Sequence, residues 1–453
     1  MRAHFIAIGG SAMHNLAIAL HHKGYKVTGS DDEIFEPSRS RLDACGILPK
    51  SIGWDDSRVT PEIEAVVLGM HAREDNPELR KARELGLKIY SYPEFLYEAT
   101  KDKIRIVIGG SHGKTSITSM IMHVFKTCGM EFDYMVGAQL EGFDTMVNLS
   151  NASKYAVFEG DEYLASTLDP RPKFHLYRPN IALISGIAWD HINVFPTFEI
   201  YIDQFRIFTK KIEKDGSLIY CANDNEVVKV ANEVSSFVNT IPYSEHPHKY
   251  IDGKVYLTKD HENIEVEIFG SHNMQNLSGA QAVCKQAGIS DQDFYKAIAT
   301  FKGAAKRLQL LGQNDQTNVY LDFAHSPSKL QATLNAVIEK FLDRKLTACM
   351  ELHTFSSLTE EFLLQYNGTM ERADVAYVYF NPHTIEHKKL KALSIEQVAK
   401  SFGSSNVKIF TDSQKLRNEL LQSNWNKRNL LLMTSGNFDG INFAEFSKEI
   451  VDR

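Results

Sequence analysis

One glycine-rich turn carries a lysine and reads Gly110-Ser111-His112-Gly113-Lys114-Thr115-Ser116, directly after an apolar run. A turn between a buried strand and a helix leaves backbone N–H groups unpaired, and the helix dipole adds positive potential there. Lys114 supplies a positive charge for phosphate oxygens, and the Thr115 hydroxyl can bind Mg²⁺. Ile108 occupies the position of the first glycine of the Walker pattern, so the loop is a variant of that motif. The sequence therefore predicts a nucleotide-phosphate loop rather than an ordinary glycine turn with a solvated lysine.

An acidic cluster, Glu159-Gly160-Asp161-Glu162, follows the predicted strand Tyr155–Phe158. Carboxylates at the carboxyl end of a parallel strand stand beside a phosphate loop in α/β proteins. Mg²⁺ prefers a few carboxylates together with substrate oxygens, so we expect one of these side chains to hold the metal. A second polar pair, Asp190-His191, follows the strand Ile181–Ile184, and by itself such a pair is usually structural.

The N-terminal turn, Ala7-Ile8-Gly9-Gly10-Ser11-Ala12, keeps only the middle glycine of the dinucleotide fingerprint G-x-G-x-x-G. Ala12 fits the G/A variant of the last position, but Ala7 is a clear miss at the first. The turn is therefore weak evidence for NAD and a distant indication of a dehydrogenase. We expect it to bind the diphosphate of another nucleotide, with Asp31 placed for a ribose or base contact.

Strands alternate with helices along the chain, which predicts parallel, doubly wound sheets. The strand Phe5–Ile8 precedes a helix whose apolar stripe predicts packing against a sheet. We expect three α/β domains: a Rossmann-like domain over residues 1–101, a central mononucleotide-binding domain over 102–312 and a C-terminal doubly wound domain over 313–453. The alternating segment Tyr250–Phe269 predicts an antiparallel hairpin in the central domain, which is therefore mixed.

Composition excludes several classes of protein. The net charge of -7 is not that of a nucleic-acid binder, and no apolar run has the length of a membrane span. No signal peptide is evident, and the five scattered cysteines indicate a reducing compartment and buried free thiols. We expect a cytoplasmic protein, and the sequence leaves its oligomeric state open.

Five motifs in order resemble the Mur ligase family, which joins amino acids or peptides to UDP-N-acetylmuramate. The phosphate loop is similar to the family's G-T-x-G-K-T-[ST], and the acidic cluster to its E-A-D-E. Gly270–Asn276 is similar to G-x-H-N-x-x-N, which holds adenine. Lys306-Arg307-Leu308-Gln309 resembles the segment with an ATP-contacting arginine, and Asp322–Pro327 resembles D-[YF]-A-H-H-P, whose aspartate reaches the ribose.

The resemblance implies an ATP-dependent ligase that uses Mg²⁺ and forms an acyl phosphate. It implies catalytic roles for Lys114, Glu159 and His191, with Thr115, Glu159 and His191 as metal ligands. The implied ATP contacts are Gly110, Ser111, His112, Gly113, Lys114, Thr115, Ser116, His272, Asn273, Asn276, Arg307, Asp322 and His325. The implied contacts to the UDP-sugar are Gly9, Gly10, Ser11, Ala12, Met13, Ser30 and Asp31.

Two branches of the family fit the N-terminal turn: one adds L-alanine, and the other attaches L-Ala-γ-D-Glu-meso-diaminopimelate in one step. The segment Arg171–Pro179 and Phe323 favour the tripeptide branch. Four positions depart from family patterns: Ala188 replaces a glutamate and Ser326 a histidine, and Thr354 and Ser357 replace arginines of the L-alanine branch. The ATP machinery is intact in the sequence and the acceptor pocket is altered, which also leaves open a nucleotide-binding regulator with a degenerate site.

Overall fold

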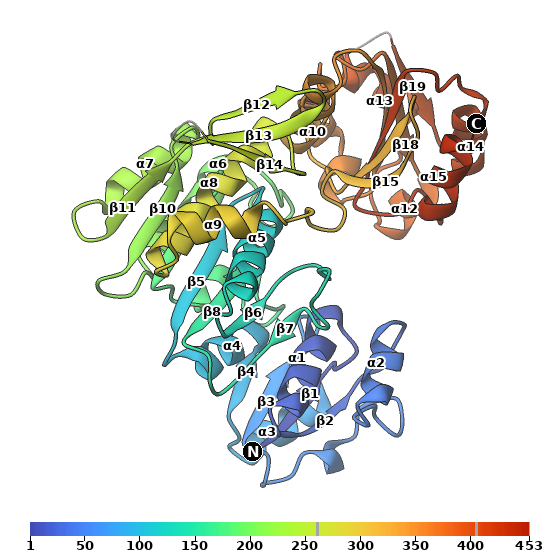
Figure 1. Cartoon of the computed structure of the whole chain (residues 1–453). Helices are drawn as coiled ribbons and strands as arrows, with labels where there is room; N and C mark the ends of the chain where they lie inside the picture. Colours follow the sequence, from blue (N-terminus) through green and yellow to red (C-terminus); the bar gives the residue numbers. More distant parts are fainter. Residues whose placement is uncertain (260–261, 404–405, 453) are drawn as a thin grey trace. The chain divides into compact units, whose positions relative to one another are not determined.

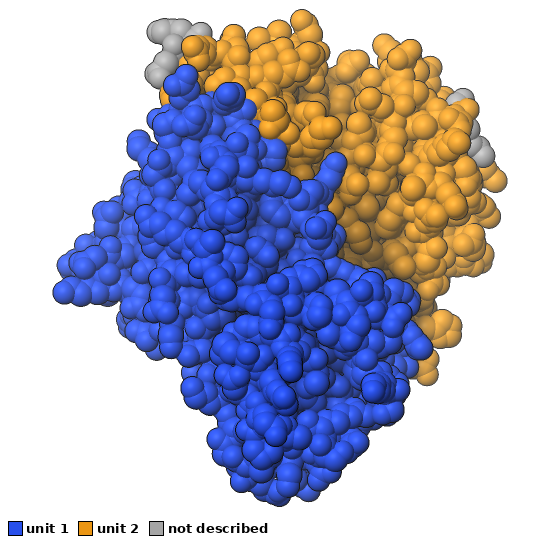
Figure 2. Space-filling view, turned by 60° about the horizontal axis from the view of Figure 1, so that its bottom comes forward, with its two compact units in different colours: residues 1–187, 197–244, 278–298 blue, residues 188–196, 245–277, 299–453 orange. Residues whose placement is uncertain are grey.

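The computed structural model of the chain describes residues 1–259, 262–403 and 406–452. They divide into two compact units, coloured separately in Figure 2. Unit 1 is made of residues 1–187, 197–244 and 278–298, and unit 2 of residues 188–196, 245–277 and 299–453. Each unit is built on its own sheets, and the helices and strands are labelled in Figure 1.

The N-terminal part of unit 1 is a four-stranded parallel sheet in the order β2-β1-β3-β4. This arrangement confirms the predicted α/β layering of the first domain. Its strands are β1 Arg2–Ile6, β2 Lys26–Ser30, β3 Ala65–Leu68 and β4 Ile89–Ser91, and its helices are α1 Ser11–His22, α2 Ser38–Ala44, α3 Pro77–Glu84 and α4 Tyr92–Thr100.

The second sheet of unit 1 has the order β11-β10-β9-β5-β8-β6-β7, and only β7 pairs in the antiparallel sense. Its strands are β5 Ile104–Gly109, β6 Phe132–Met135, β7 Val147–Asn148, β8 Tyr155–Glu159, β9 Ile181–Ile184, β10 Ser217–Cys221 and β11 Asn239–Tyr243. The helices α5 Lys114–Thr127, α6 Phe198–Thr209, α7 Asn225–Val234 and α9 Asp291–Ile298 belong to the same unit. Strand β5 lies in the middle of the sheet, so its carboxyl end is a point at which the strand order reverses and ligands usually bind.

Unit 2 contains a small antiparallel sheet and a larger, mostly parallel one. The small sheet is made of β12 His248–Ile251, β13 Lys254–Lys259 and β14 Glu262–Val266, where a hairpin was predicted. The larger sheet has the order β15-β16-β20-β17-β18-β19, with only β15 antiparallel. Its strands are β15 Gln309–Gln313, β16 Asn318–Asp322, β17 Lys345–Leu352, β18 Val375–Phe380, β19 Val407–Phe410 and β20 Arg428–Met433.

The helices of unit 2 alternate with the strands of its larger sheet. They are α10 Pro327–Lys340, α11 Glu360–Leu363, α12 Pro382–His387, α13 Ile395–Phe402, α14 Ser413–Gln422 and α15 Phe443–Val451, and α8 Ser271–Gln286 begins in this unit. The capping box predicted at Ser394 is present, since the Ser394 side chain accepts from Gln397 N and Ser394 N donates to the Gln397 side chain.

Two sequence predictions are wrong in detail. The first strand ends at Ile6 rather than Ile8, because Ala7 has a φ of 70° and leaves the extended conformation. The five cysteines are free, but Cys128 is exposed and Cys45 is half-buried. No helix among the described residues is long and apolar enough to cross a membrane.

Replacing Ala7 by glycine is expected to raise the free energy of unfolding by about 0.5–1 kcal/mol, because glycine adopts a positive φ without strain. Gly69 leaves room for the Ala7 methyl group, because a Cβ added at Gly69 would lie 2.7 Å from Ala7 Cβ. Urea unfolding of the two proteins measures the difference. A less stable variant would show that packing of this methyl outweighs the backbone strain.

Candidate active site

The predicted phosphate loop connects β5 to α5 in unit 1, as the sequence indicated. Gly110 has a φ of 134° and Gly113, which caps α5, a φ of 79°. Both values lie in the region that favours glycine, so the backbone turns sharply at the helix N-terminus. Ser111 N donates to Gly186 O at 2.9 Å, which fixes the start of the loop against the segment after β9.

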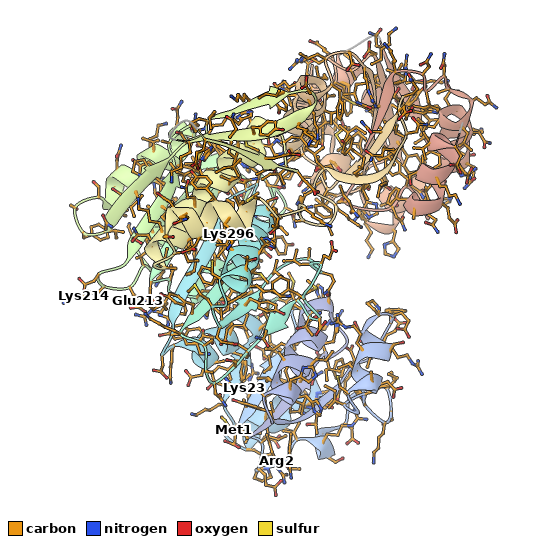
Figure 3. All side chains as sticks on the ribbon, in the orientation of Figure 1. Met1, Arg2, Lys23, Glu213, Lys214 and Lys296 are labelled. Atoms are coloured by element: carbon orange, nitrogen blue, oxygen red, sulfur yellow. The ribbon has the colours of Figure 1, made fainter. Side chains whose placement is uncertain are left out.

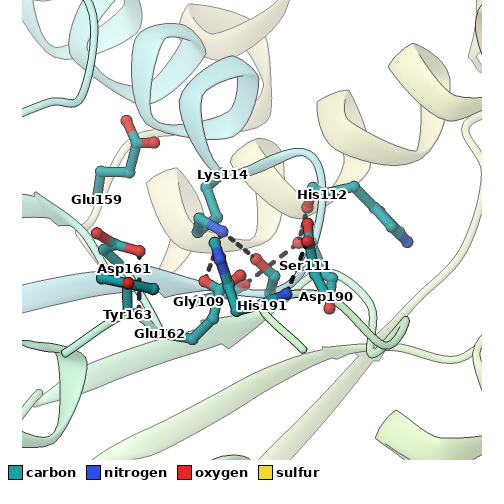
Figure 4. A network of polar contacts seen from close by, with 12 residues as sticks. Gly109, Ser111, His112, Lys114, Glu159, Asp161, Glu162, Tyr163, Asp190 and His191 are labelled. Carbon is teal, nitrogen blue, oxygen red and sulfur yellow. Dashed lines mark hydrogen bonds and ion pairs between the residues drawn. The ribbon is translucent and has the colours of Figure 1, made fainter. Parts of the chain in front are cut away.

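Lys114 lies at the centre of this site and points toward the acidic cluster (Figure 4). Its Nζ donates to Glu162 Oε2 at 2.6 Å and to Gly110 O at 2.6 Å. Burial opposes the charge of Lys114, but the carboxylates of Glu162, Asp161 and Glu159 raise its pKa above the ordinary value. Lys114 is therefore positively charged. The Glu162 carboxylate lies beside it, at the place where phosphate oxygens are expected to bind.

Glu162 is held by a chain of hydroxyl groups. The carboxylate is 1% exposed and accepts from Tyr201 Oη at 3.1 Å. Tyr201 also lies 2.7 Å from Ser111 Oγ, so that it connects the acidic cluster to the phosphate loop. Tyr201 belongs to α6, where only an apolar helical pattern was visible, and sequence reasoning missed it.

Thr115 and Glu159, the two predicted metal ligands of unit 1, are in contact. Thr115 Oγ1 donates to Glu159 Oε1 at 2.8 Å, and Gly137 N donates to the other oxygen at 2.8 Å. A Cβ on Gly137 would lie 3.0 Å from Glu159 Oε1, so a glycine is needed there. A hydroxyl beside a carboxylate suits Mg²⁺, which takes few protein ligands and several from phosphates and water.

No cluster of three or more His, Cys, Asp or Glu side chains that could hold a metal occurs among the described residues. Thr115 and Glu159 are thus the described pair that fits a metal shared with nucleotide phosphates. The remaining predicted ligand, His191, belongs to unit 2, and its role stays a prediction.

His112 of the loop packs on a glycine of the neighbouring segment. A Cβ on Gly186 would lie 2.3 Å from the His112 ring, so any other residue there would displace the imidazole. Ser185 Oγ donates to His112 O and to Gly109 O. The segment after β9 therefore shapes the loop from outside, a feature that the motif itself did not reveal.

Asp190 and His191 lie in the first segment of unit 2, in a turn whose backbone is strained at His191. His191 has a φ of 54° and donates its backbone N–H to Asp190 Oδ1 at 2.8 Å. Asp190 Oδ2 lies 3.6 Å from Lys329 Nζ and 4.0 Å from His325 Nε2. Burial raises the pKa of Asp190, but Lys329, His191 and His325 outweigh it and hold the pKa well below its ordinary value.

His325 is expected to make the stability of the protein fall below pH 6.5. Burial and the nearby Lys329 lower its pKa to about 3, although Asp190 opposes the shift. In the unfolded chain the imidazole takes a proton near pH 6.5, so stability is full above that pH and is lost progressively toward pH 3. Urea unfolding between pH 7 and pH 4.5 should show a flatter profile for His325→Asn, and equal slopes would contradict this assignment.

Asp322 ends β16 and holds the segment that carries Arg307. Its carboxylate accepts from Leu308 N and from Ala324 N, each at 2.7 Å. Lys306 and Leu308 have φ values of 54° and 46°, so this contact fixes a strained turn. The Arg307 guanidinium lies 4.7 Å from the ring centre of Phe323. Asp322 thus holds the turn next to Arg307, a structural role that the sequence did not show, and the ATP contacts of both residues stay a prediction.

His272, Asn273 and Asn276 lie in the first turns of α8, in unit 2. Asn273 Nδ2 donates to Phe269 O at 2.9 Å, and both asparagines are buried. Burial lowers the pKa of His272, against the opposing charge of Asp322. The residues predicted to contact adenine and ribose therefore gather in one part of unit 2.

The N-terminal turn lies at the carboxyl ends of β1 and β2. Gly9 N donates to Asp31 Oδ2 at 2.7 Å, and Ser30 Oγ accepts from Arg58 Nη1 at 2.7 Å. Burial raises the pKa of Asp31 to about 6, although the Gly9 N–H opposes this shift. Gly10 caps α1, so that Ser11, Ala12 and Met13 form its first turn. The predicted UDP-sugar residues thus lie together, and sequence reasoning missed the cation, Arg58.

The segment 353–357, which departs from the sequence pattern of the L-alanine branch, follows β17 in unit 2. It closes on itself, because Ser357 N donates to Thr354 Oγ1 at 3.1 Å. Buried Glu351 accepts from Phe438 N at 3.0 Å and from Thr434 Oγ1, and lies 3.6 Å from His353 Nδ1. This carboxylate joins the loops after β17 and β20, where a family arginine is absent.

Three family models match the chain. They are the Mur ligase family, catalytic domain, over residues 2–104, the Mur ligase middle domain over residues 108–284 and the Mur ligase, glutamate ligase domain, over residues 306–437. The three matches fall in the order expected for three α/β domains.

Two related proteins share one name, UDP-N-acetylmuramate–L-alanine ligase. A UDP-N-acetylmuramate–L-alanine ligase of Caldicellulosiruptor bescii is 32% identical over 391 residues, which cover 83% of this chain and 82% of the relative. One of Clostridium kluyveri is 31% identical over 385 residues and covers 82% of each chain.

Solved structures show the same fold. The murein peptide ligase of Psychrobacter arcticus matches with a TM-score of 0.65 and 22% identity over 100% of this chain and 99% of that one. MurC of Thermotoga maritima matches with a TM-score of 0.70 and 19% identity over 100% and 99%. The motifs, the three domain matches and the relatives agree: the chain belongs to the Mur ligase family of ATP-dependent ligases that form amide bonds.

Proposed function

We propose that this enzyme joins L-Ala-γ-D-Glu-meso-diaminopimelate to the carboxylate of UDP-N-acetylmuramate, at the expense of ATP, in the cytoplasm. The observation that carries the ligase chemistry is the phosphate loop, in which Lys114 faces Glu162 and Thr115 contacts Glu159. Such a site binds nucleotide phosphates and stabilises the negative charge of the transition state of phosphoryl transfer.

The choice of the tripeptide is supported by the acceptor loop. The L-alanine branch has two arginines where this chain has Thr354 and Ser357, and a single amino acid offers mainly its carboxylate to such arginines. In this chain the loop is instead organised by Glu351 and His353. A pocket without these arginines is suited to an acceptor that is bound along its length.

The segment Arg171–Pro179, which resembles the tripeptide branch, contacts the acidic cluster. Lys173 Nζ donates to Asp161 Oδ2 at 2.6 Å, and Phe174 N donates to Asp161 O at 3.1 Å. Arg171 forms ion pairs with Asp169 and Glu94 at 2.6 and 2.8 Å. These contacts with Asp161 support a role for this segment beside the proposed catalytic residues of unit 1.

The residues of this chain act by charge and position. Lys114 would neutralise the γ-phosphoryl group as it passes to the muramyl carboxylate, which gives an acyl phosphate. The free amine of the acceptor then attacks the acyl carbon, and phosphate leaves with the electron pair of the broken C–O bond. Mg²⁺ bound at Thr115 and Glu159 would supply further positive charge to the phosphate oxygens.

An acceptor panel tests the proposal. ATP, Mg²⁺ and UDP-N-acetylmuramate are incubated with L-alanine, L-Ala-D-Glu or the tripeptide, and phosphate release is followed with the mass of the product. We expect the tripeptide to give the highest kcat/KM. Preference for L-alanine, the activity in the names of the two sequence relatives above, would identify the alternative acceptor. No turnover with any acceptor would contradict the ligase function.

A further inference from the structure

A cavity of about 720 Å³ lies within unit 2, and none of the residues assigned above to catalysis or nucleotide binding is among its lining residues, although Phe269 and Leu308 of its wall contact Asn273 and Asp322. Its wall is formed by the β13–β14 hairpin, by the segment 302–315 and by the end of α10; Figure 1 shows that hairpin beside α10. The volume is that of a pocket for a small organic molecule. Its floor is aromatic, with Phe269, Tyr320 and Phe341.

Four cationic and three acidic residues line this cavity: Lys254, Lys302, Lys340 and Arg344, with Glu265, Glu267 and Asp315. Lys254 is paired with Glu265 at 2.9 Å. Among the described residues, no carboxylate lies within ion-pair distance of the three other cations, Lys302, Lys340 and Arg344. These three cations are therefore open to direct contact with an anionic ligand, although the net charge of the lining is close to neutral.

Lys340 is held over the aromatic floor. Its Nζ lies 4.0 Å from the ring centre of Phe269 and 5.5 Å from that of Phe341. Burial lowers its pKa to about 8, although Glu267 opposes the shift. At pH 7.5 the neutral, nucleophilic fraction of such an amine is roughly 200 times that of an ordinary lysine.

Arg344 stacks on the same ring, Phe341, as Lys340 and can still form a charge-assisted hydrogen bond with an anion. Its guanidinium stacks 5.4 Å from the ring centre of Phe341. It donates to two carbonyl oxygens, Asn429 Oδ1 at 3.4 Å and Asp315 O at 3.1 Å. Neither partner is charged, so a phosphate group would gain a charge-assisted hydrogen bond there.

We propose that this cavity is a modification site, in which Lys340 is acylated by small acyl phosphates whose phosphate group is bound by Lys302 and Arg344. The Nζ lone pair attacks the carbonyl carbon, a C–N bond forms and the C–O bond to phosphate breaks. Phosphate leaves with that electron pair, and the nitrogen proton goes to solvent. The product is a neutral amide, which removes a charge from a half-buried position.

Mass spectrometry of the full-length protein tests the proposal without any assay of ligase activity. Acetyl phosphate is the probe, and acetylation of each lysine is followed over time at pH 7, 8 and 9. We expect Lys340 to react at least about tenfold faster at pH 7 than the exposed lysines Lys214 and Lys296, labelled in Figure 3, because the lower nucleophilicity of a less basic amine offsets part of its larger neutral fraction. The advantage should shrink toward pH 9, as the exposed lysines lose their protons.

A neutral acetyl donor, an N-hydroxysuccinimide ester, separates phosphate recognition from amine reactivity. With Lys302→Gln or Arg344→Gln, acetyl phosphate should modify Lys340 several-fold more slowly, while the neutral ester reacts at a similar rate. Arg344→Lys should restore part of the selectivity. The charged groups that face Lys340 here are Glu265, Glu267, Asp315, Lys254, Lys302 and Arg344.

Two results would overturn the proposal. In one, Lys340 reacts no faster with acetyl phosphate than Lys214 and Lys296. In the other, the variants slow both reagents equally, so that no phosphate subsite exists. Thermal unfolding of each variant shows whether unit 2 is intact, and none of these outcomes bears on the proposed ligase reaction.

Discussion

Replacing Lys114 by methionine is expected to lower acceptor-dependent phosphate release from ATP by at least about 1000-fold. Methionine keeps much of the length and volume of the side chain but removes the charge that faces the phosphoryl group. The loss should fall on kcat more than on the KM for ATP, because charge builds up mainly in the transition state. Steady-state phosphate release at saturating acceptor measures both.

This substitution has a structural side effect that needs its own control. Without Lys114, the buried Glu162 carboxylate loses its ion pair with that lysine, which is expected to destabilise unit 1 by about 3–5 kcal/mol. The double variant Lys114→Met, Glu162→Gln should recover much of that stability and none of the activity. If the double variant regains turnover, the loss in the single variant came from folding and Lys114 has no catalytic role.

Replacing Gly110 by alanine is expected to abolish ATP binding and to destabilise unit 1 by more than about 3 kcal/mol. The added Cβ would lie 2.1 Å from Ser185 Oγ and 3.0 Å from Ser185 N. Because the nearer atom belongs to a serine that donates to His112 O, relief of this contact would also displace the loop. The φ of 134° adds backbone strain. Nucleotide titration and thermal unfolding measure the two effects.

Gly24 provides a matched control for backbone strain. It lies in the same unit with a φ of 90°, and an added Cβ there would meet nothing within 4 Å. Gly24→Ala should therefore cost about 1–2 kcal/mol and leave nucleotide binding unchanged. Equal losses of stability in the two variants would show that backbone strain alone, and not the contact with Ser185, causes the effect of Gly110→Ala.

The elements that carry the site were predictable because short-range patterns determine them. The apolar run Ile104–Ile108 and the glycines after it specify a buried strand and a sharp turn in any context. The position of the acidic cluster beside the phosphate loop also followed from the rule that the carboxyl ends of parallel strands meet at one edge, and Glu159 is the member of the cluster that contacts Thr115. Local sequence therefore led to the phosphate loop and to its acidic neighbour.

Other parts of the site depend on contacts between distant residues. Tyr201 lies on an ordinary amphipathic helix, and nothing in its neighbours marks its hydroxyl as a partner of Glu162. Gly137 and Gly186 matter because of the side chains that pack on them, which a single sequence does not reveal. The end of the first strand was misplaced for a similar reason, since the left-handed Ala7 is tolerated only because Gly69 leaves room.

The ion pair between Lys114 and Glu162 makes nucleotide binding an exchange of counter-ions rather than a simple addition. In the proposed complex the triphosphate would replace Glu162 as the partner of Lys114, and the Glu162 carboxylate would stay buried beside the Tyr201 hydroxyl. Lys114 therefore attracts anions less strongly than a lysine without an ion-pair partner would. We therefore expect the resting loop to bind phosphate or sulfate alone weakly, because a ligand with many additional contacts is needed to compensate for the broken Lys114–Glu162 pair.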